Sequence, residues 1–78
     1  MSSGKIDKLV RMANQIGDFF APQPQANAAE GVANHLKRFW TPKMISEIIA
    51  RSAEAVSGLN PTAALGVALL RANELQRA

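Results

Sequence analysis

The sequence predicts an all-α fold, a compact four-helix domain with short capped connections. Four segments carry apolar residues three and four positions apart, which is the spacing of an amphipathic helix. Prolines and short polar clusters separate these segments, and no stretch shows the strict apolar–polar alternation of a half-buried strand. With 78 residues the chain has the length of one small domain, so we expect a single helical domain over residues 1–78.

The first helix is expected over residues 5–21. Its apolar positions fall on one arc at 100° per residue: Ile6, Leu9, Val10, Ala13, Ile16, Gly17 and Phe20. Met12 and Phe19 widen this arc beyond what one neighbouring helix requires. The prolines at positions 22 and 24 end the segment, because each lacks a backbone N–H and disfavours the helical conformation of the residue before it.

The second helix is expected over residues 27–40. Asn27 and Glu30 have the spacing of a capping box, which predicts the start of the helix. The apolar arc of this helix comprises Ala29, Val32, Ala33, Leu36, Phe39 and Trp40. Lys37 and Arg38 are predicted to face away from the arc.

The third and fourth helices begin with the same two-residue motif. They are expected over residues 42–57 and 61–76. Thr41-Pro42 and Asn60-Pro61 each place a capping side chain before a proline at the first helical position. The predicted buried stripe of the third helix is Ile45, Ile48, Ile49, Ser52 and Val56, and Ser57-Gly58 provides the stop. The fourth helix is apolar nearly all round its first half, with Leu65, Ala68 and Leu69 on one face and Ala63, Val67 and Leu70 opposite.

Composition indicates a thin core that benefits from a partner. Fourteen of the residues are alanine, and small domains usually add a disulfide, a metal or a partner to a core of this size. The chain has no cysteine, which excludes disulfides, thiolate zinc sites and iron–sulfur ligation. No apolar stretch approaches the ~20 residues that span a bilayer, so we expect no membrane contact, and the absence of cysteine is compatible with a cytoplasmic location.

Catalytic motifs are absent from the sequence. There is no nucleophile elbow and no glycine-rich phosphate loop. His35 has Glu30 and Ser46 nearby in sequence, but we expect it on the rim of its helix beside Phe39, without an orienting partner. We therefore expect no catalytic, cofactor-binding or metal-binding residues in this chain.

The basic residues leave nucleic-acid binding as an alternative function. The net charge is +3, and the excess lies in residues 35–43, which hold three basic residues and no acid. Phe39 and Trp40 next to Lys37, Arg38 and Lys43 resemble a platform for base stacking with phosphate contacts. Against this, Lys37 and Arg38 are predicted to point away from the aromatic arc. The positive charge is also confined to one short segment and does not form the extended basic surface typical of nucleic-acid binding.

The surplus of apolar residues favours a protein partner. Contiguous apolar surface that a core does not need marks a site of protein contact. The candidate partner-interface residues are Met12, Phe19, Arg38, Phe39, Trp40, Pro42, Lys43, Val67 and Leu70. For Phe39 and Trp40 the competing interpretation is that both are simply core, since they share the arc of the second helix.

Three motifs carry a resemblance to a known family. They are LVRMANQIGDFF at residues 9–20, HLKRFWTPKM at residues 35–44 and GLNP at residues 58–61. Together they resemble the delta subunit of the soluble NAD-dependent, molybdenum-containing formate dehydrogenases, and the middle motif is the most specific. The chain departs from the family pattern at Thr41 and Asn60, where aspartate is common; all three residue types cap helices.

The resemblance implies a small non-catalytic subunit of a bacterial cytoplasmic enzyme. In that enzyme a large alpha subunit carries the molybdenum cofactor, a bis(guanine dinucleotide) molybdopterin, together with iron–sulfur clusters, and oxidises formate to carbon dioxide. A beta subunit carries FMN and reduces NAD, and a gamma subunit carries a further iron–sulfur cluster. The resemblance implies that the delta subunit docks on the alpha subunit and supports the stability or assembly of the complex.

Overall fold

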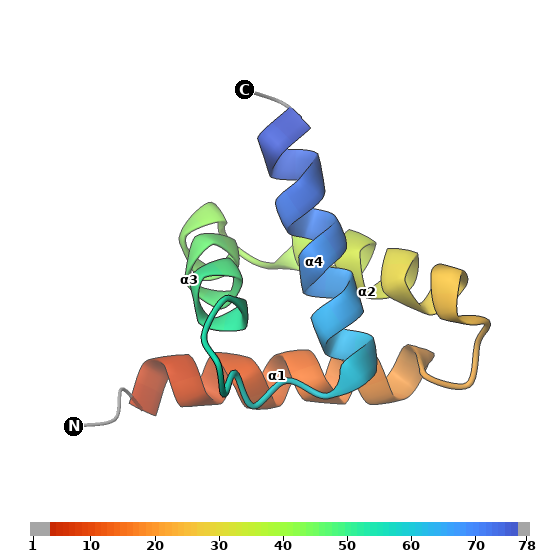
Figure 1. The fold of residues 1–78 in the computed structure, drawn as a ribbon, viewed down its shortest axis with the longest axis horizontal. Helices are drawn as coiled ribbons and strands as arrows, with labels where there is room; N and C mark the ends of the chain where they lie inside the picture. Colours follow the sequence, from red (N-terminus) through yellow and green to blue (C-terminus); the bar gives the residue numbers. More distant parts are fainter. Residues whose placement is uncertain (1–3, 77–78) are drawn as a thin grey trace.

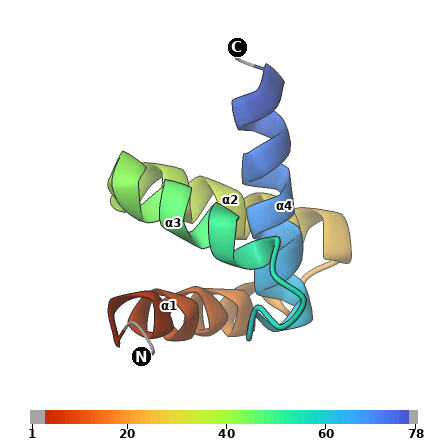
Figure 2. The same cartoon turned by 60° about the vertical axis from the view of Figure 1, so that its left-hand side comes forward.

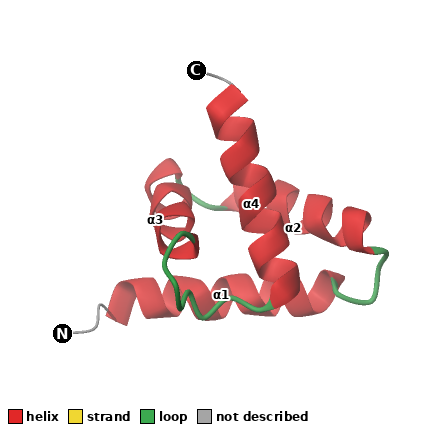
Figure 3. Ribbon diagram, viewed as in Figure 1, coloured by secondary structure: helices red, strands yellow, loops and turns green. Residues whose placement is uncertain are grey.

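Four helices make up the part of the chain that the computed structural model describes, residues 4–76, with side chains described for residues 4–74 (Figure 1). They are α1 (Gly4–Phe20), α2 (Gln25–Phe39), α3 (Pro42–Ser52) and α4 (Pro61–Gln76). Between residues 4 and 76 the connections are loops and turns without any strand (Figure 3). The all-α prediction is therefore confirmed.

Helix α4 organises the packing. It contacts each of the other three helices, and its most extensive contact is with α2. Figures 1 and 2 both show α4 rising steeply from α1, with its last turns projecting beyond the other helices. The radius of gyration is 11.6 Å, close to the about 11.5 Å expected for a compact chain of this length.

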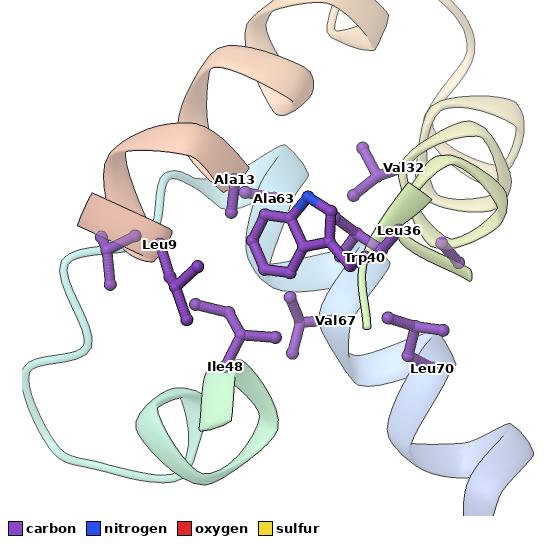
Figure 4. Close-up of a cluster of buried hydrophobic side chains, with 11 residues drawn as sticks. Leu9, Ala13, Val32, Leu36, Trp40, Ile48, Ala63, Val67 and Leu70 are labelled. Atoms are coloured by element: carbon purple, nitrogen blue, oxygen red, sulfur yellow. The ribbon is translucent and has the colours of Figure 1, made fainter. Parts of the chain in front are cut away.

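The hydrophobic core draws on every helix. Its buried members are Leu9, Val10, Ala13, Val32, Ala33, Leu36, Trp40, Ile48, Ala63, Val67 and Leu70. Figure 4 shows the Trp40 indole among side chains from α1, α2 and α4, with Ile48 of α3 nearby. Burying one large apolar side chain contributes roughly 1.5–3 kcal/mol, so a core with few large members gives a modest total.

The first two helices differ slightly from their predicted bounds. Helix α1 begins and ends one residue earlier than expected, and α2 begins two residues earlier and ends one residue earlier. The predicted capping box of Asn27 and Glu30 is wrong: Pro24 occupies the N-cap position, and no side chain caps the helix there. A proline is tolerated at this position because the backbone N–H that it lacks would have no partner inside the helix.

The two predicted caps before proline are confirmed. Thr41 Oγ1 accepts a hydrogen bond of 3.2 Å from the backbone N–H of Met44, at the start of α3. Asn60 Oδ1 accepts a bond of 2.8 Å from the N–H of Ala63, at the start of α4. Each bond satisfies one of the amides that a helix N-terminus leaves without an internal partner.

Helix α3 is shorter than predicted and ends at Ser52 rather than at residue 57. The Ser52 hydroxyl donates to the carbonyl of Ile49 at 2.6 Å, and the Arg51 guanidinium Nε donates to the carbonyl of Ser57 at 3.1 Å. These bonds fold the following residues back as a loop, and Val56, predicted in the buried stripe, is 81% exposed. Gly58 lies in this loop with a φ of +83°, a backbone conformation that a residue without a Cβ adopts readily.

A hydrogen-bonded cluster joins that loop and α4 to α1. The side-chain amide of Asn14 donates to the Gly58 carbonyl at 3.0 Å, and its carbonyl accepts from the Asn60 N–H at 2.8 Å. Asn60 Nδ2 donates to the Asn14 carbonyl and to Asp18 Oδ1, both at 3.1 Å. Gly17 lies against this cluster, where an added Cβ would be 2.8 Å from Asn60 Oδ1. The cap of α4 is thus also a clasp between two helices.

Helix α4 buries the face that we expected to be free. Ala63, Gly66, Val67 and Leu70 point into the core, whereas Leu65 and Ala68 are exposed. Gly66 lets α2 and α4 cross closely, because an added Cβ would collide with the Val32 side chain. The predicted interface positions Val67 and Leu70 are therefore wrong, since both are core residues in the contact with the other helices.

Candidate docking groove

An apolar groove lies between α1, the end of α2 and the start of α3. Its volume is about 640 Å³, within the range of typical ligand sites. Nine residues line it, and we call this site the aromatic groove: Met12, Gln15, Ile16, Phe19, Phe20, His35, Phe39, Trp40 and Met44. All but the glutamine and the histidine are apolar.

Helix α1 provides one wall through positions that follow the helical repeat. Met12, Ile16 and Phe19 are spaced four and three residues apart and therefore share a face. The rings of Phe19 and Phe20 meet edge to face with centroids 5.0 Å apart. Phe20 packs against the backbone of α2 at Gly31, where an added Cβ would be 2.5 Å from the ring. Phe20 is thereby half-buried, while Phe19 remains 74% exposed.

The end of α2 provides the opposite wall. The rings of His35 and Phe39 lie one helical turn apart, with centroids 4.8 Å apart and a tilt of 43°. This confirms the prediction that His35 sits beside Phe39. The Phe39 ring is 69% exposed, although the sequence pattern placed it on the buried arc.

Trp40 accounts for the outward position of Phe39. Helix α2 ends at Phe39, and Trp40 adopts an extended backbone with φ −95° and ψ 147°. Its indole turns into the core and is only 7% exposed, so its remaining accessible edge forms part of the groove floor. The core interpretation is therefore correct for Trp40 and wrong for Phe39.

Two basic residues are next in sequence to residues that line the groove. Arg38 precedes Phe39 on α2, Lys43 precedes Met44 on α3, and both are exposed. Asp18, the acid next to Phe19 in the sequence, is also exposed and accepts a hydrogen bond from Asn60, the residue before α4. The end of α2 and the start of α3 therefore carry exposed positive charge in the same stretch of chain as apolar groove residues.

The structure brings together part of the predicted interface. Met12, Phe19 and Phe39 line the groove, and Arg38, Pro42 and Lys43 are exposed at nearby positions in the sequence without lining it. Trp40 contributes only its edge, and Val67 and Leu70 are excluded by burial. The sequence reasoning missed five lining residues: Gln15, Ile16, Phe20, His35 and Met44. Ile16 and Phe20 were on the predicted apolar arc, so the missing information was how far the neighbouring helices cover that arc.

The described residues show neither a metal-ligand cluster nor a membrane span. Among residues whose placement is described, no group of three histidine, aspartate or glutamate side chains could hold a metal ion. Within residues 4–76, no helix is both long and apolar enough to cross a bilayer.

Fold and groove together define a small all-helical domain with an exposed apolar surface, the kind of surface that marks contact with another protein. The family model of the NADH-dependent formate dehydrogenase delta subunit, FdsD, matches residues 8–67 of the 78-residue chain. The chain therefore belongs to the FdsD family, and all nine residues of the aromatic groove lie inside the matched region. Comparison with curated proteins and with solved structures finds no match.

Proposed function

We propose that this chain is a non-catalytic accessory subunit that docks on the large, molybdenum-containing alpha subunit of a formate dehydrogenase and stabilises the complex or helps to assemble it. The observation that carries the proposal is the aromatic groove, with two exposed phenylalanines inside the region that matches the FdsD family. Exposed aromatic side chains next to a concave surface are typical anchors of protein interfaces.

The energetics support such a role. Phe19 and Phe39 project on opposite walls of the groove, and each leaves most of its ring in water. Transfer of one such ring into an interface contributes roughly 1.5–3 kcal/mol, so both together exceed the value of a tenfold change in affinity, about 1.4 kcal/mol. A basic flank formed by Arg38 and Lys43 adds orientation to this apolar attraction.

The redox centres belong, in this proposal, to the partner subunits. Iron–sulfur clusters need thiolate ligands, and this chain has no cysteine. The molybdenum cofactor and iron–sulfur clusters are assigned to the alpha subunit, FMN to the beta subunit and a further cluster to the gamma subunit. The complex that these subunits form is proposed to be cytoplasmic and to transfer electrons from formate to NAD.

The nucleic-acid-binding alternative has no observation in its favour. It required Phe39 and Trp40 to form a joint stacking platform, but the Trp40 indole is buried in the core. One exposed ring with two flanking cations is a small surface for gripping a strand of nucleic acid.

The proposal is tested by co-purification. An affinity-tagged chain is co-expressed with the formate dehydrogenase subunits, and the recovered proteins are quantified by mass spectrometry. We expect the alpha subunit to be recovered with the natural chain, and its recovery to fall at least about tenfold for the double variant Phe19→Ala/Phe39→Ala. The matched control is Leu65→Ala, a half-exposed apolar position on α4 that does not line the aromatic groove. Full recovery with the double variant would refute docking through the groove, and absence of the alpha subunit from the natural pull-down would refute the proposed partner.

A further inference from the structure

The chemistry of the aromatic groove restricts the backbone conformation of whatever binds it. Three of its nine lining residues offer polar side-chain groups, namely Gln15, His35 and the indole N–H of Trp40, and its walls are helices whose backbone groups are already paired. In an extended segment placed there, the amides that face these walls would lose water and find few partners. Each unsatisfied group would cost about 1–3 kcal/mol. A helix satisfies its own backbone and needs only apolar side chains toward the groove.

The charge around the groove restricts the side chains of that helix. Between Glu30 and Glu47 the sequence contains basic residues and no acid. Arg38 and Lys43 are exposed in this stretch and are adjacent in sequence to the groove residues Phe39 and Met44. Glu47, the next acid along α3, is half-buried, and its Oε1 is shielded from solvent, so it does not neutralise this edge from the outside.

We infer that the aromatic groove binds an amphipathic helix of the large subunit that presents apolar side chains at successive turns and carries aspartate or glutamate along one flank. The apolar side chains lie between Phe19 and Phe39, and the acidic flank lies against Arg38 and Lys43. This inference rests on the proposed function, because it takes the large subunit as the source of the helix. It adds the secondary structure and the charge pattern of the docking segment.

Zero-length carbodiimide cross-linking of the purified complex tests the inference. This reagent joins a lysine amine to a carboxylate only where the two are in contact. We expect Lys43 to be joined to an aspartate or glutamate within a helical segment of the large subunit that repeats apolar residues every three or four positions. The variant Lys43→Arg keeps the positive charge but lacks the amine, so this cross-linked peptide should disappear when yield is normalised to recovered complex.

Charge reversal provides the second measurement. The double variant Arg38→Glu/Lys43→Glu should weaken co-purification of the large subunit by about tenfold or more, and the loss should shrink at high salt. Arg71→Glu is the control, because it makes the same kind of charge reversal at an exposed position on α4 that does not line the aromatic groove. Both variants are measured in the complete complex, and circular dichroism of the purified chain checks that each remains helical.

The outcomes separate the inference from the proposed function. Recovery of the large subunit without a Lys43 cross-link, and without sensitivity to charge reversal, would overturn the acidic helix while leaving docking intact. A Lys43 cross-link to a second copy of this chain, or to a segment of the large subunit that is a strand, would also overturn it. Failure to recover the large subunit with the natural chain would refute the proposed function and the inference together.

Discussion

Two neighbouring aromatic residues have opposite roles in this protein. The end of α2 at Phe39 turns the Trp40 indole into the core and leaves the Phe39 ring in the groove. The change from helical to extended backbone between them separates side chains that a continuous helix would hold about 100° apart. At this scale a single backbone change decides which aromatic stabilises the fold and which is available to a partner.

Alanine substitutions should separate these two roles. Trp40→Ala should lower the free energy of unfolding of the chain by about 3–5 kcal/mol, because it opens a cavity in a small core. Phe39→Ala should change it by less than about 0.5 kcal/mol, because the ring is largely in water. Urea denaturation followed by circular dichroism measures both values. Equal losses for the two variants would contradict the assigned roles.

Asn60 combines a helix cap with the clasp to α1. Thr41→Ala, which removes only a cap, should cost about 1 kcal/mol of unfolding free energy. Asn60→Ala should cost about 2–3 kcal/mol, because the same change also removes its bonds to the Asn14 carbonyl and to Asp18. In a double-mutant cycle with Asn14→Ala the costs should be less than additive, since both changes break one cluster. Additive costs would show that cap and clasp act independently.

At the scale of elements, α4 holds the other helices together. Like α1, it packs on each of the other three helices, and its crossing with α2 is close because Gly66 faces Val32. An ion pair of 3.4 Å between Asp7 and Arg51 links α1 to the end of α3. Arg51 is half-buried and also reaches the Ser57 carbonyl, so this side chain fixes the loop as well as the pair.

Gly66→Ala should test the close crossing of α2 and α4. Alanine favours a helix over glycine by about 1 kcal/mol, so an unconstrained site would gain stability. Here the added methyl group collides with Val32, and we expect a net loss of about 1–3 kcal/mol in unfolding free energy. Gly4→Ala is the matched control, because nothing lies within 4 Å of the added Cβ. A gain in stability for Gly66→Ala would show that the two helices separate without cost.

The whole molecule combines a small core with a large unfilled groove. Its core contains many alanines and valines, and the aromatic groove leaves two phenylalanines in water. Domains of this size bury only about 60% of the surface of their unfolded chain, so the margin of stability is narrow. A partner that covers the groove would stabilise the folded chain by mass action.

The isolated chain should be strongly helical by far-ultraviolet circular dichroism and should self-associate. Apolar walls that lack their partner can pair with a second copy, so the apparent mass in sedimentation equilibrium should rise with concentration. Phe19→Ala/Phe39→Ala should reduce this self-association without reducing helicity. The purified chain should also retain no stoichiometric iron, molybdenum or flavin. A monomer at all concentrations that melts as high as the complete complex would contradict the need for a partner.

The sequence by itself determined the helices and their boundaries wherever local chemistry sets them. Apolar spacing predicted all four helices of the described residues, and the Thr41-Pro42 and Asn60-Pro61 pairs located two helix starts, because a cap and a proline act within one turn. The motifs were also enough to suggest the FdsD family, which the family model confirms. Part of the lining of the aromatic groove was predicted as well, since Met12 and Phe19 exceeded what one neighbouring helix can cover.

The tertiary structure alone decided which apolar faces are buried. Helix α4 is apolar nearly all round, so no pattern could show that Val67 and Leu70 point inward while Leu65 points to solvent. Beyond the early end of α3, Arg51 reaches both Asp7 and Ser57, and these contacts span 44 and 6 residues that apolar spacing does not connect. The groove has the same origin: it exists because three consecutive helices, as they pack in the folded chain, stop short of covering one another's aromatic side chains. Burial is a property of the assembled helices, and a periodic pattern can specify a face only when one side of the helix is polar.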